Sequence, residues 1–388
     1  MLPGIGVFGT AAEVRVLVPI LRDKGFKIEA IWGRTICEAE EAAKELNIIF
    51  YTNKIDDVLL KKDVDLVFIF CPPHLHSQIS VKALGIGKHV VCERMGLGQV
   101  DALKMVRGSQ YYPSLISLVN YSLRFLPAFV DMKRRLHEEY LGPIKYVSLI
   151  DVRVQIRSLL SDKYDWLCDA TMGGGVLNLI GSHIIDLVSF LIGRRATKVH
   201  GVVKTYNKMT KNVCGIRQVT APDFCNFQME LDGGEVIVTV SILTNISSTT
   251  FLQEVLVCGR DGHLIVRNTD LFGQRNSTGK EETLFVDKDN VQTATSVNNV
   301  MPYPYINGMC KMIGALRESF IQEQSSWVKE PVQSAATFEH GLYVQAVLDA
   351  IRQSSENKTW LKVNVMSESP TNHAKIMTAA RMSAVVMH

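Results

Sequence analysis

The stretch IGVFGTAAEV, residues 5–14, decides the fold of this chain. Its first four residues, Ile5–Phe8, are apolar and predict a short strand, and a glycine follows where that strand ends. The next residues predict a helix, Glu13–Lys24, which Pro19 interrupts. A strand, a glycine turn and a helix in this order begin a βαβ unit, so we expect a parallel sheet in the N-terminal part.

The same alternation continues over the first 120 residues. Ile28–Trp32 and His89–Cys92 predict further strands, and Cys37–Leu46 and Ser77–Leu84 predict helices. The segment Val64–Cys71 reads VDLVFIFC, a nearly continuous apolar run that is typical of a strand buried on both faces. These segments together predict a parallel sheet with helices between its strands.

Two glycine patterns overlap at the first turn. Residues 4–9 match G-x-G-x-x-G, but Gly4 and Gly6 lie at or inside the strand, whereas the motif must follow one. The turn therefore starts at Gly9, with Ala11 in place of the second glycine and Val14 in place of the third. A pyrophosphate would then bind the free N–H groups at the helix N-terminus. The same residues are equally compatible with an ordinary turn between a strand and a helix.

The end of the second strand bears on the choice of nucleotide. An acidic residue there would bind the ribose 2′-hydroxyl of NAD, but the chain has Trp32-Gly33-Arg34-Thr35. An arginine followed by a hydroxyl suits a 2′-phosphate, which favours NADP over NAD. The alternative is an arginine that faces solvent after a strand.

Helices become longer and strands pair differently after Arg124. Ala128–Tyr140, Ile180–Leu191, Met309–Gln322 and Ala335–Gln353 all have helical patterns of apolar residues. The strand-like runs between them are residues 146–154, 197–204, 224–231, 236–243, 253–258 and 263–266.

Turn signals join several of these runs directly. Asp232-Gly233-Gly234 is a strong hairpin signal, and Gly259–Gly262 separates another pair. Consecutive hairpins predict an antiparallel or mixed sheet. Residues 268–300 are polar and are expected to be irregular.

The chain has 388 residues, which at about 150 residues per domain indicates two domains or perhaps three. We expect an α/β fold with an N-terminal Rossmann NAD(P)-binding domain, residues 1–122. A C-terminal α+β domain with a large, mostly antiparallel open sheet would span residues 123–365 and serve substrate binding and oligomerisation. Residues 366–388 would form a tail.

Composition excludes several classes of protein. Hydrophobic residues make up 47% and charged residues 21%, which is typical of a globular chain. Lys and Arg number 42 and Asp and Glu 39, so 42 − 39 leaves +3, too small an imbalance for a nucleic-acid-binding surface. The most apolar window, Val176–Gly193, contains Asn178, His183 and Asp186, which argues against a membrane span.

The N-terminus and the cysteines indicate a cytoplasmic protein. No basic segment precedes a long apolar stretch, so a signal peptide is not expected, although export by another route stays open. The eight cysteines form no CxxC pair, which favours reduced core thiols. His74 and His76 have no third ligand nearby, so no metal site is expected.

Further motifs identify a family. They are CPP at residues 71–73 with His76, GKHVVCER at 87–94, RFLP at 124–127, GGG at 173–175 and GSHIID at 181–186. In this order and spacing they resemble the glucose–fructose oxidoreductase / inositol dehydrogenase (Gfo/Idh/MocA) family of sugar oxidoreductases. The resemblance covers nearly the whole chain. It implies a Rossmann half that binds NAD(P) and a second half that covers the nicotinamide and often builds a dimer or tetramer.

The turn, the second strand and the resemblance together give a set of expected site residues. The expected cofactor-binding residues are Gly9, Thr10, Ala11, Arg34, Thr35, Cys71, Pro72, His76, Glu93, Arg94 and Arg124. The expected catalytic residues are His183 and Arg94, and the expected substrate-binding residues are Trp166, Gly174 and Asp186.

Two departures from the family pattern affect the chemistry. The family's E-K-P is Glu93-Arg94-Met95 here, and arginine stays protonated, so it can clamp an acidic group but cannot act as a base. The family also places an aspartate four residues before the histidine that takes the substrate proton. That position is Leu179, which cannot orient His183, although Asp186 is close enough in sequence to reach its other side.

Three functions follow from this reading. The first is an NADP(H)-dependent oxidoreductase that transfers hydride to or from a sugar or sugar derivative, including one with an acidic group. The second is a catalytically impaired NADP(H)-binding protein that acts as a sensor or as a regulatory or scaffold subunit. The third is an internally cycling NAD(P) catalyst of the epimerase or glycosidase type. In each case we expect a homodimer or higher homo-oligomer built through the C-terminal sheet.

Overall fold

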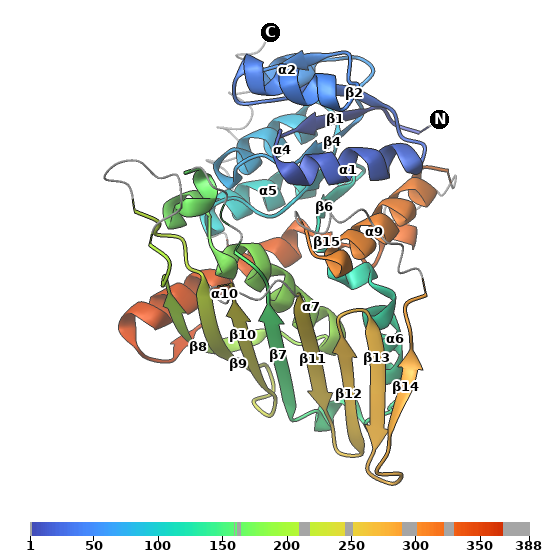
Figure 1. Cartoon of the computed structure of the whole chain (residues 1–388), viewed down its shortest axis with the longest axis vertical. Coiled ribbons are helices and arrows are strands. Elements are labelled where there is room, and N and C mark those ends of the chain that lie inside the picture. The colour runs from blue at the N-terminus through green and yellow to red at the C-terminus, as the bar shows by residue number, and fades with distance from the viewer. Residues whose placement is uncertain are drawn as a thin grey trace.

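The computed structural model describes residues 2–158, 160, 164–208, 218–244, 251–288, 301–321 and 330–367. Within these residues the chain forms two sheets that lie one above the other along its long axis (Figure 1). The first sheet contains seven strands and the second contains nine. The site expected from the sequence lies where these two parts meet.

The first sheet confirms the predicted Rossmann fold. Its strand order is β15-β6-β5-β4-β1-β2-β3, and all pairs except β15–β6 are parallel. Every residue of β1 (Ile5–Phe8) and β4 (Leu66–Ile69) is buried, because helices cover both faces of the sheet. The other strands are β2 (Ile28–Trp32), β3 (Tyr51–Thr52), β5 (His89–Cys92), β6 (Ser117–Val119) and β15 (Ala336–Thr337). The helices are α1 (Ala12–Asp23), α2 (Ile36–Glu45), α3 (Ile55–Leu59), α4 (His76–Gly85) and α5 (Gln99–Tyr111).

The second sheet is mostly antiparallel, as predicted. Its order is β14-β13-β12-β11-β7-β10-β9-β8-β16, and the β7–β10 pair is parallel. Buried and half-buried residues alternate along its central strands, so only one face packs against a core. The strands are β7 (Leu149–Gln155), β8 (Ala196–Lys204), β9 (Phe224–Leu231), β10 (Ile237–Leu243), β11 (Leu252–Cys258), β12 (Gly262–Arg267), β13 (Asp270–Arg275), β14 (Glu281–Phe285) and β16 (Leu361–Lys362).

Helices cover that one face of the second sheet. They are α6 (Pro127–His137), α7 (Ser182–Ile192) and α10 (Phe338–Asn357), which lie behind the strands in Figure 1. Helix α9 (Tyr303–Ile321) packs on α1 of the first part and begins six residues before the predicted start at Met309.

One prediction about this sheet is wrong. Residues 268–300 were expected to be irregular, but β13 and β14 extend the sheet at its edge. Edge strands tolerate polar and charged residues, and β14 begins with Glu281 and Glu282, so their composition hid the strand pattern. Residues 289–300 and the expected tail from residue 368 onward lie outside the described part of the chain.

The chain returns to the first sheet late in the sequence. Strand β15 pairs with β6 through Ala336↔Val119 and Thr337↔Leu118, and α9 packs on α1 in the same apolar core. Helix α10 then contacts both α5 of the first domain and β8 of the second. The first part therefore includes α9 and β15 as well as residues from the expected range 1–122, although both lie within the range 123–365. Helix α10 joins the two parts.

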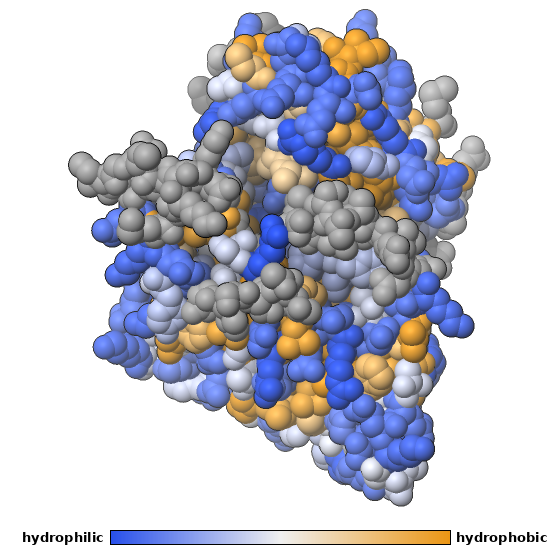
Figure 2. Space-filling model, in the orientation of Figure 1, coloured by the Kyte–Doolittle hydropathy of each residue, from blue (hydrophilic) through white to orange (hydrophobic). Residues whose placement is uncertain are grey.

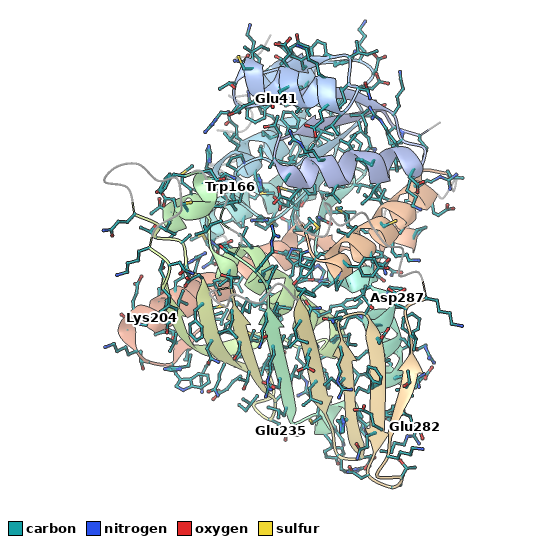
Figure 3. The ribbon with its side chains drawn as sticks, in the orientation of Figure 1. Glu41, Trp166, Lys204, Glu235, Glu282 and Asp287 are labelled. Carbon is teal, nitrogen blue, oxygen red and sulfur yellow. The ribbon has the colours of Figure 1, made fainter. Side chains whose placement is uncertain are left out.

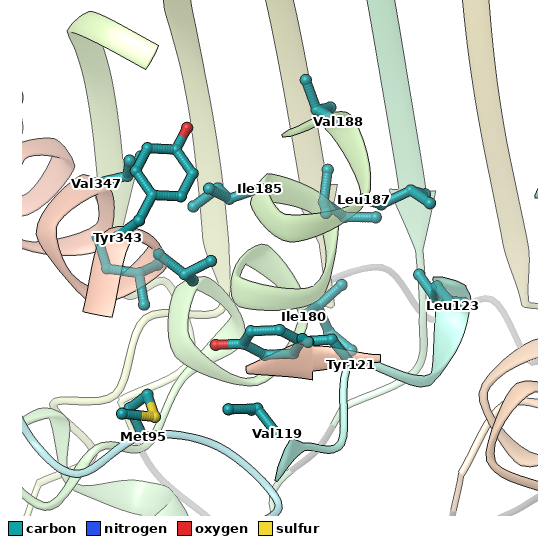
Figure 4. Close-up of a cluster of buried hydrophobic side chains, with 14 of the residues drawn as sticks. Met95, Val119, Tyr121, Leu123, Ile180, Ile185, Leu187, Val188, Tyr343 and Val347 are labelled. Carbon is teal, nitrogen blue, oxygen red and sulfur yellow. The ribbon is translucent and has the colours of Figure 1, made fainter. Parts of the chain in front are cut away.

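Apolar side chains fill the junction between the two parts. Figure 4 shows Tyr121 from the first part beside Ile180 from the second, with Met95 below them and Tyr343 of α10 above. All four side chains are buried in one continuous core cluster. Met95 and Tyr121 of this junction also line the pocket described below.

In the described part of the chain, one helical stretch is long and apolar enough to cross a membrane. It is Ala170–Ile192, and 94% of its most apolar window is buried inside the protein. Core helices of globular proteins pass the same test, so the finding agrees with the expectation drawn from the polar residues in this segment.

Candidate functional site

The first turn has the shape that a bound phosphate needs. Gly9 has a φ of +135°, and a Cβ on it would lie 2.4 Å from the carbonyl oxygen of Phe70. Only glycine fits there. The N-cap of α1, Ala11, makes no side-chain hydrogen bond to the helix, so the first N–H groups of α1 have no capping side chain. Uncapped N–H groups at a helix start favour an anion, and this fits a dinucleotide pyrophosphate. As predicted, the discounted Gly4–Gly9 match lies largely within β1.

A basic side chain beside this turn, that of Arg15, already has hydrogen-bond partners. The Arg15 guanidinium donates to the carbonyl oxygen of Thr10 at 2.6 Å and forms an ion pair with Glu45 at 2.7 Å. Arg15 therefore holds the backbone of the turn. A phosphate at this turn would be bound by backbone N–H groups and the α1 dipole.

The end of β2 presents the residues expected at a 2′-phosphate. Arg34 is exposed and forms an ion pair with Glu38 at 2.8 Å, within one turn of α2. Thr35 is the N-cap of α2, and its hydroxyl accepts a hydrogen bond from the backbone N–H of Glu38 at 3.2 Å. A phosphate here would compete with the Glu38 carboxylate for the Arg34 guanidinium.

His76 links the end of β4 to the end of β5. Its Nε2 lies 2.6 Å from the carbonyl oxygen of Cys71, and its Nδ1 lies 2.9 Å from that of Arg94. Burial lowers the pKa of His76 to about 4, so the ring is neutral at pH 7 and donates to one of these two oxygens. The Cys71 thiol is also buried, which raises its pKa. His76 thus fixes the ends of β4 and β5, with the half-buried Pro72 at the turn between Cys71 and the helix.

Arg94 lies at the end of β5 with hydrogen-bonding capacity to spare. Its Nη2 pairs with the Glu93 carboxylate. Its Nε and Nη1 are buried and, within the described residues, have no hydrogen-bond partner. The guanidinium carbon lies 5.8 Å from the centre of the Trp166 ring, and Trp166 comes from the second domain (Figure 3). A buried guanidinium with two nitrogens that lack hydrogen-bond partners can donate hydrogen bonds to an oxyanion.

A pocket adjoins Arg94 between the two domains. Its empty volume is about 310 Å³, including the part open to solvent. The face seen in Figure 2 is hollowed at the same level of the molecule, and hydrophilic side chains line the visible part of the hollow. The lining residues are Pro73, Arg94, Met95, Gly96, Leu97, Tyr121, Gly173, Asn178, Ser182, Gln345 and Leu348.

His183 is held between two tyrosine rings. Its ring centre lies 5.4 Å from that of Tyr121 and 5.1 Å from that of Tyr305, and both contacts are edge to face. The residue is 8% exposed, and its Nδ1 is buried without a partner among the described residues. Burial, with a smaller effect of the Arg94 charge, lowers the pKa of His183 to about 3. The ring is neutral at physiological pH and is a weak base there.

Asp186 does not support His183. The two Asp186 oxygens accept hydrogen bonds from Nε and Nη2 of Arg124, both at 2.7 Å. Burial raises the pKa of the Asp186 carboxyl, and the Arg124 charge opposes that rise. Arg124 also donates to the carbonyl oxygen of Ser334 at 3.3 Å. The structure places this ion pair in the protein interior, with 5% of the Arg124 side chain and 2% of the Asp186 side chain exposed.

Two glycines of the loop before α7, Gly173 and Gly174, have different surroundings. A Cβ on Gly174 would lie 2.3 Å from the carbonyl oxygen of Leu167, so Gly174 packs closely against the 3₁₀ turn that carries Trp166. Gly173, with a φ of +89°, lines the pocket instead. Of the expected site residues, Arg94 lines the pocket and Trp166 lies beside its guanidinium, whereas the described lining residues include neither His183 nor Gly174.

Sequence reasoning missed three features of this region. Residues Leu177–Gly181 form a π-helical turn directly before α7, a feature that often marks functional sites. Tyr305 reaches His183 from α9, 122 residues later in the chain. The first turn of α1 carries the half-buried carboxylate Glu13, which the residue pattern alone did not indicate. Within the described residues, no group of three His, Cys, Asp or Glu side chains could hold a metal ion.

Comparisons with known proteins agree with this architecture. Residues 4–94 match the model of the oxidoreductase family NAD-binding Rossmann fold, and residues 133–363 match that of its C-terminal alpha/beta domain. The chain is 49% identical to glucose-fructose oxidoreductase domain-containing protein 2 of Homo sapiens over 98% of each chain. It is 47% identical to glucose-fructose oxidoreductase domain-containing protein 1 of Xenopus tropicalis over 95% of each.

Solved structures show the same fold. A levoglucosan dehydrogenase in complex with NADH and L-sorbose superposes with a TM-score of 0.75 at 16% identity, covering 94% of this chain and 99% of that one. An aldose-aldose oxidoreductase from Caulobacter crescentus gives 0.72 at 17% identity, covering 93% and 100%. The two family models together span most of the sequence, and both full-length relatives are well above 30% identical. The chain therefore belongs to the Gfo/Idh/MocA oxidoreductase family.

Proposed function

We propose that this protein is an NADP(H)-dependent oxidoreductase that acts on a sugar derivative bearing an acidic group. The observation that carries the proposal is Arg94, whose Nε and Nη1 are buried at the end of β5 beside the pocket and have no hydrogen-bond partner among the described residues. A neutral sugar hydroxyl would satisfy this guanidinium poorly, whereas a carboxylate or phosphate oxygen pairs with it strongly. The structural neighbours that bind or act on sugars support the sugar class.

The dinucleotide would lie across the carboxyl ends of the strands. When bound, it supplies the hydride acceptor or donor. The Gly9 turn and the uncapped start of α1 would hold the pyrophosphate, and the end of β2 would hold the adenosine. Arg94 would orient the substrate's acidic group, and Trp166 would cover the mouth of the cleft. His183 would accept the hydroxyl proton as an alcohol carbon loses its hydride.

NADP is proposed over NAD because of Arg34 and Thr35. No carboxylate follows β2 directly to bind a ribose 2′-hydroxyl, and Arg34 is exposed at the start of α2. Binding of NADPH and NADH to the purified full-length protein, measured by calorimetry, tests this choice. Arg34→Gln should weaken NADPH binding about tenfold or more and leave NADH binding nearly unchanged. Equal weakening of both, or of neither, would contradict the assignment.

A second candidate function has its own observation. His183 has a pKa of about 3, and neither Leu179 nor Asp186 supplies an acceptor for its Nδ1. A base of that strength takes a proton from an alcohol slowly at neutral pH. This favours a protein that retains the cofactor and the ligand pocket but has impaired turnover, so that it acts as a sensor or a regulatory subunit.

One experiment separates the two functions. NADPH oxidation is followed by absorbance with a panel of neutral sugars, uronic acids, sugar phosphates and their keto forms. Turnover that Arg94→Gln abolishes for acidic substrates, and that Arg134→Gln on the exposed side of α6 leaves intact, supports the oxidoreductase. Tight NADPH binding without turnover on the whole panel supports the sensor. Absence of dinucleotide binding would overturn both.

We also propose self-association through the second sheet. Its central strands alternate buried with half-buried side chains, and the described helices cover only the buried face. A sheet face of this size paired with a second copy would give a two-fold dimer. Light scattering or sedimentation of the purified protein tests this proposal, and a monomer at micromolar concentration would refute it.

A further inference from the structure

Four polar side chains form a hydrogen-bonded row beside the pocket. Arg352 of α10 donates to the amide oxygen of Asn178 in the π-helical turn, and also to the Asp349 carboxylate at 2.6 Å. The same carboxylate accepts a hydrogen bond from the amide nitrogen of Gln345 at 3.1 Å. Asn178 and Gln345, the two ends of the row, line the pocket. The row therefore presents two amides to whatever occupies the pocket.

The charged pair in the middle of the row fixes the orientation of both amides. A guanidinium only donates hydrogen bonds, so Asn178 must present its Oδ1 to Arg352. A carboxylate only accepts them, so Gln345 must present its Nε2 to Asp349. The polar atoms left for a ligand are then the Nδ2 of Asn178 and the Oε1 of Gln345. One amide offers a donor and the other offers an acceptor.

The π-helical turn at Leu177–Gly181 explains why Asn178 reaches this position. A π turn has i→i+5 hydrogen bonds in place of i→i+4, which changes the residues that share a helix face. Leu179, at the position where the family has its aspartate, packs against the apolar core cluster, whereas Asn178 lines the pocket. The Ser182 hydroxyl donates to the carbonyl oxygen of Asn178 at 2.6 Å, which holds the turn in this register.

The pocket thus offers two kinds of binding group. Arg94 supplies Nε and Nη1, which have no hydrogen-bond partner among the described residues and suit an anion. The Asn178 donor and the Gln345 acceptor suit a hydroxyl group, because a hydroxyl both accepts and donates. A carboxylate could use the donor but would meet the Gln345 oxygen with a lone pair. The two amides therefore match a different part of the ligand from the part that Arg94 matches.

We propose that Asn178 and Gln345 form a hydroxyl-binding subsite that makes the protein select hydroxylated acids over plain carboxylic acids. Arg352 and Asp349 act as positioning residues, because they hold the two amides in opposite orientations. The inference rests on the proposed binding of an acidic sugar derivative at Arg94. It adds the residues that recognise the hydroxyl groups of that ligand.

The test compares acids that differ in their hydroxyl groups. Calorimetry gives the affinities of the full-length protein for D-gluconate, D-galactonate, D-glucuronate and hexanoate, with NADPH present because it cannot oxidise an alcohol. Hexanoate has the chain length of gluconate but carries no hydroxyl. We expect the wild type to bind at least one hydroxylated acid more tightly than hexanoate. Asn178→Ala should weaken that acid by about three- to tenfold, as expected for one lost hydrogen bond, and leave hexanoate nearly unchanged.

Two further substitutions separate the subsite from the acid site and from a general loss of structure. Arg94→Gln should weaken hydroxylated acids and hexanoate alike, by about tenfold or more. Asn357→Ala, at the exposed end of α10, is the matched control and should change neither affinity.

Arg352 tests the positioning role. Arg352→Met frees the Asn178 amide to turn and should reduce the preference for the hydroxylated acid without weakening hexanoate. Arg352→Lys keeps a donor for the Asn178 oxygen and should retain most of the preference. Equal loss of preference in both variants would contradict the positioning role.

A variant at the other end of the row keeps the test decisive if Asn178→Ala folds poorly. Gln345→Met keeps the length of the side chain but removes the acceptor, and it should reduce the same preference. A wild type that binds hexanoate as tightly as every hydroxylated acid, or an unchanged preference in either folded variant, overturns the subsite and leaves the acid site at Arg94 standing. A wild type that binds none of the four acids overturns the proposed substrate class and this inference together.

Discussion

The buried pair between Arg124 and Asp186 gives the sharpest prediction of stability. Both contacts measure 2.7 Å, and the two side chains are 5% and 2% exposed. Asp186→Asn keeps the size of the side chain but removes its charge, so the Arg124 guanidinium remains buried with a carbonyl of Ser334 as its main partner. Breaking a buried pair in this way costs about 3–5 kcal/mol of unfolding free energy.

The matched control is a pair on the surface. Asp56→Asn in the first domain removes the partner of Lys82; Asp56 is 61% exposed and lies 2.8 Å from the Lys82 ammonium. Exposed pairs contribute about 0–1 kcal/mol, so this variant should be close to the wild type. Urea unfolding followed by circular dichroism gives both values. The double variant Arg124→Met/Asp186→Leu should recover most of the lost stability, because it leaves no buried charge unpaired.

The same variants decide whether this pair is structural or binds ligand. If the pair is structural, Asp186→Asn that is still folded at low temperature should bind NADPH with wild-type affinity. A stability loss below about 1 kcal/mol, together with weaker binding, would refute the reasoning. That result would instead support the roles predicted from the sequence, in which Arg124 binds the cofactor and Asp186 binds the substrate.

Two further predictions concern packing and pH. Gly341→Ala should lower the unfolding free energy by about 1–2 kcal/mol, because the new Cβ would lie 2.4–2.5 Å from atoms of Met95. Gly314→Ala is the control and should be neutral or stabilising, because no atom lies within 4 Å of the new Cβ. Equal effects of the two substitutions in urea unfolding would contradict this prediction. Burial holds the pKa of His183 near 3 and that of His76 near 4, below the value of about 6.5 expected in the unfolded chain. The unfolded state therefore binds more protons below pH 6.5, and by pH 5 stability should fall by about 2 kcal/mol for each histidine; urea midpoints that do not fall between pH 7.5 and pH 5 would refute it.

Local patterns predicted the first domain well. The turn at Gly9 and the buried strand predicted within residues 64–71, which the structure shows as β4, follow from residues within about ten positions of each other. Period and glycine placement report such short-range structure directly. The same is true of the Asp232–Gly234 turn, which joins β9 and β10 as predicted.

Long-range pairing was beyond the reach of the sequence pattern. Asp186 was expected near His183, three residues away, but it pairs with Arg124, which is 62 positions earlier. Tyr305 reaches His183 from a helix whose start was misplaced. A charged residue in an apolar helix must be paired when it is buried, but a single sequence does not identify the residue that pairs with it. The environment that sets the pKa of His183 was therefore visible only in three dimensions.

The late return of the chain through α9 and β15 makes the nucleotide domain dependent on residues from the end of the sequence. A fragment that stops at residue 122 would leave the edge of β6 open and the apolar side of α1 bare. Such a piece would be prone to aggregate when expressed alone. An isolated nucleotide-binding unit would need the segment that carries α9 and β15. It would be made by linking that segment directly to residues 1–122, and not by simple truncation.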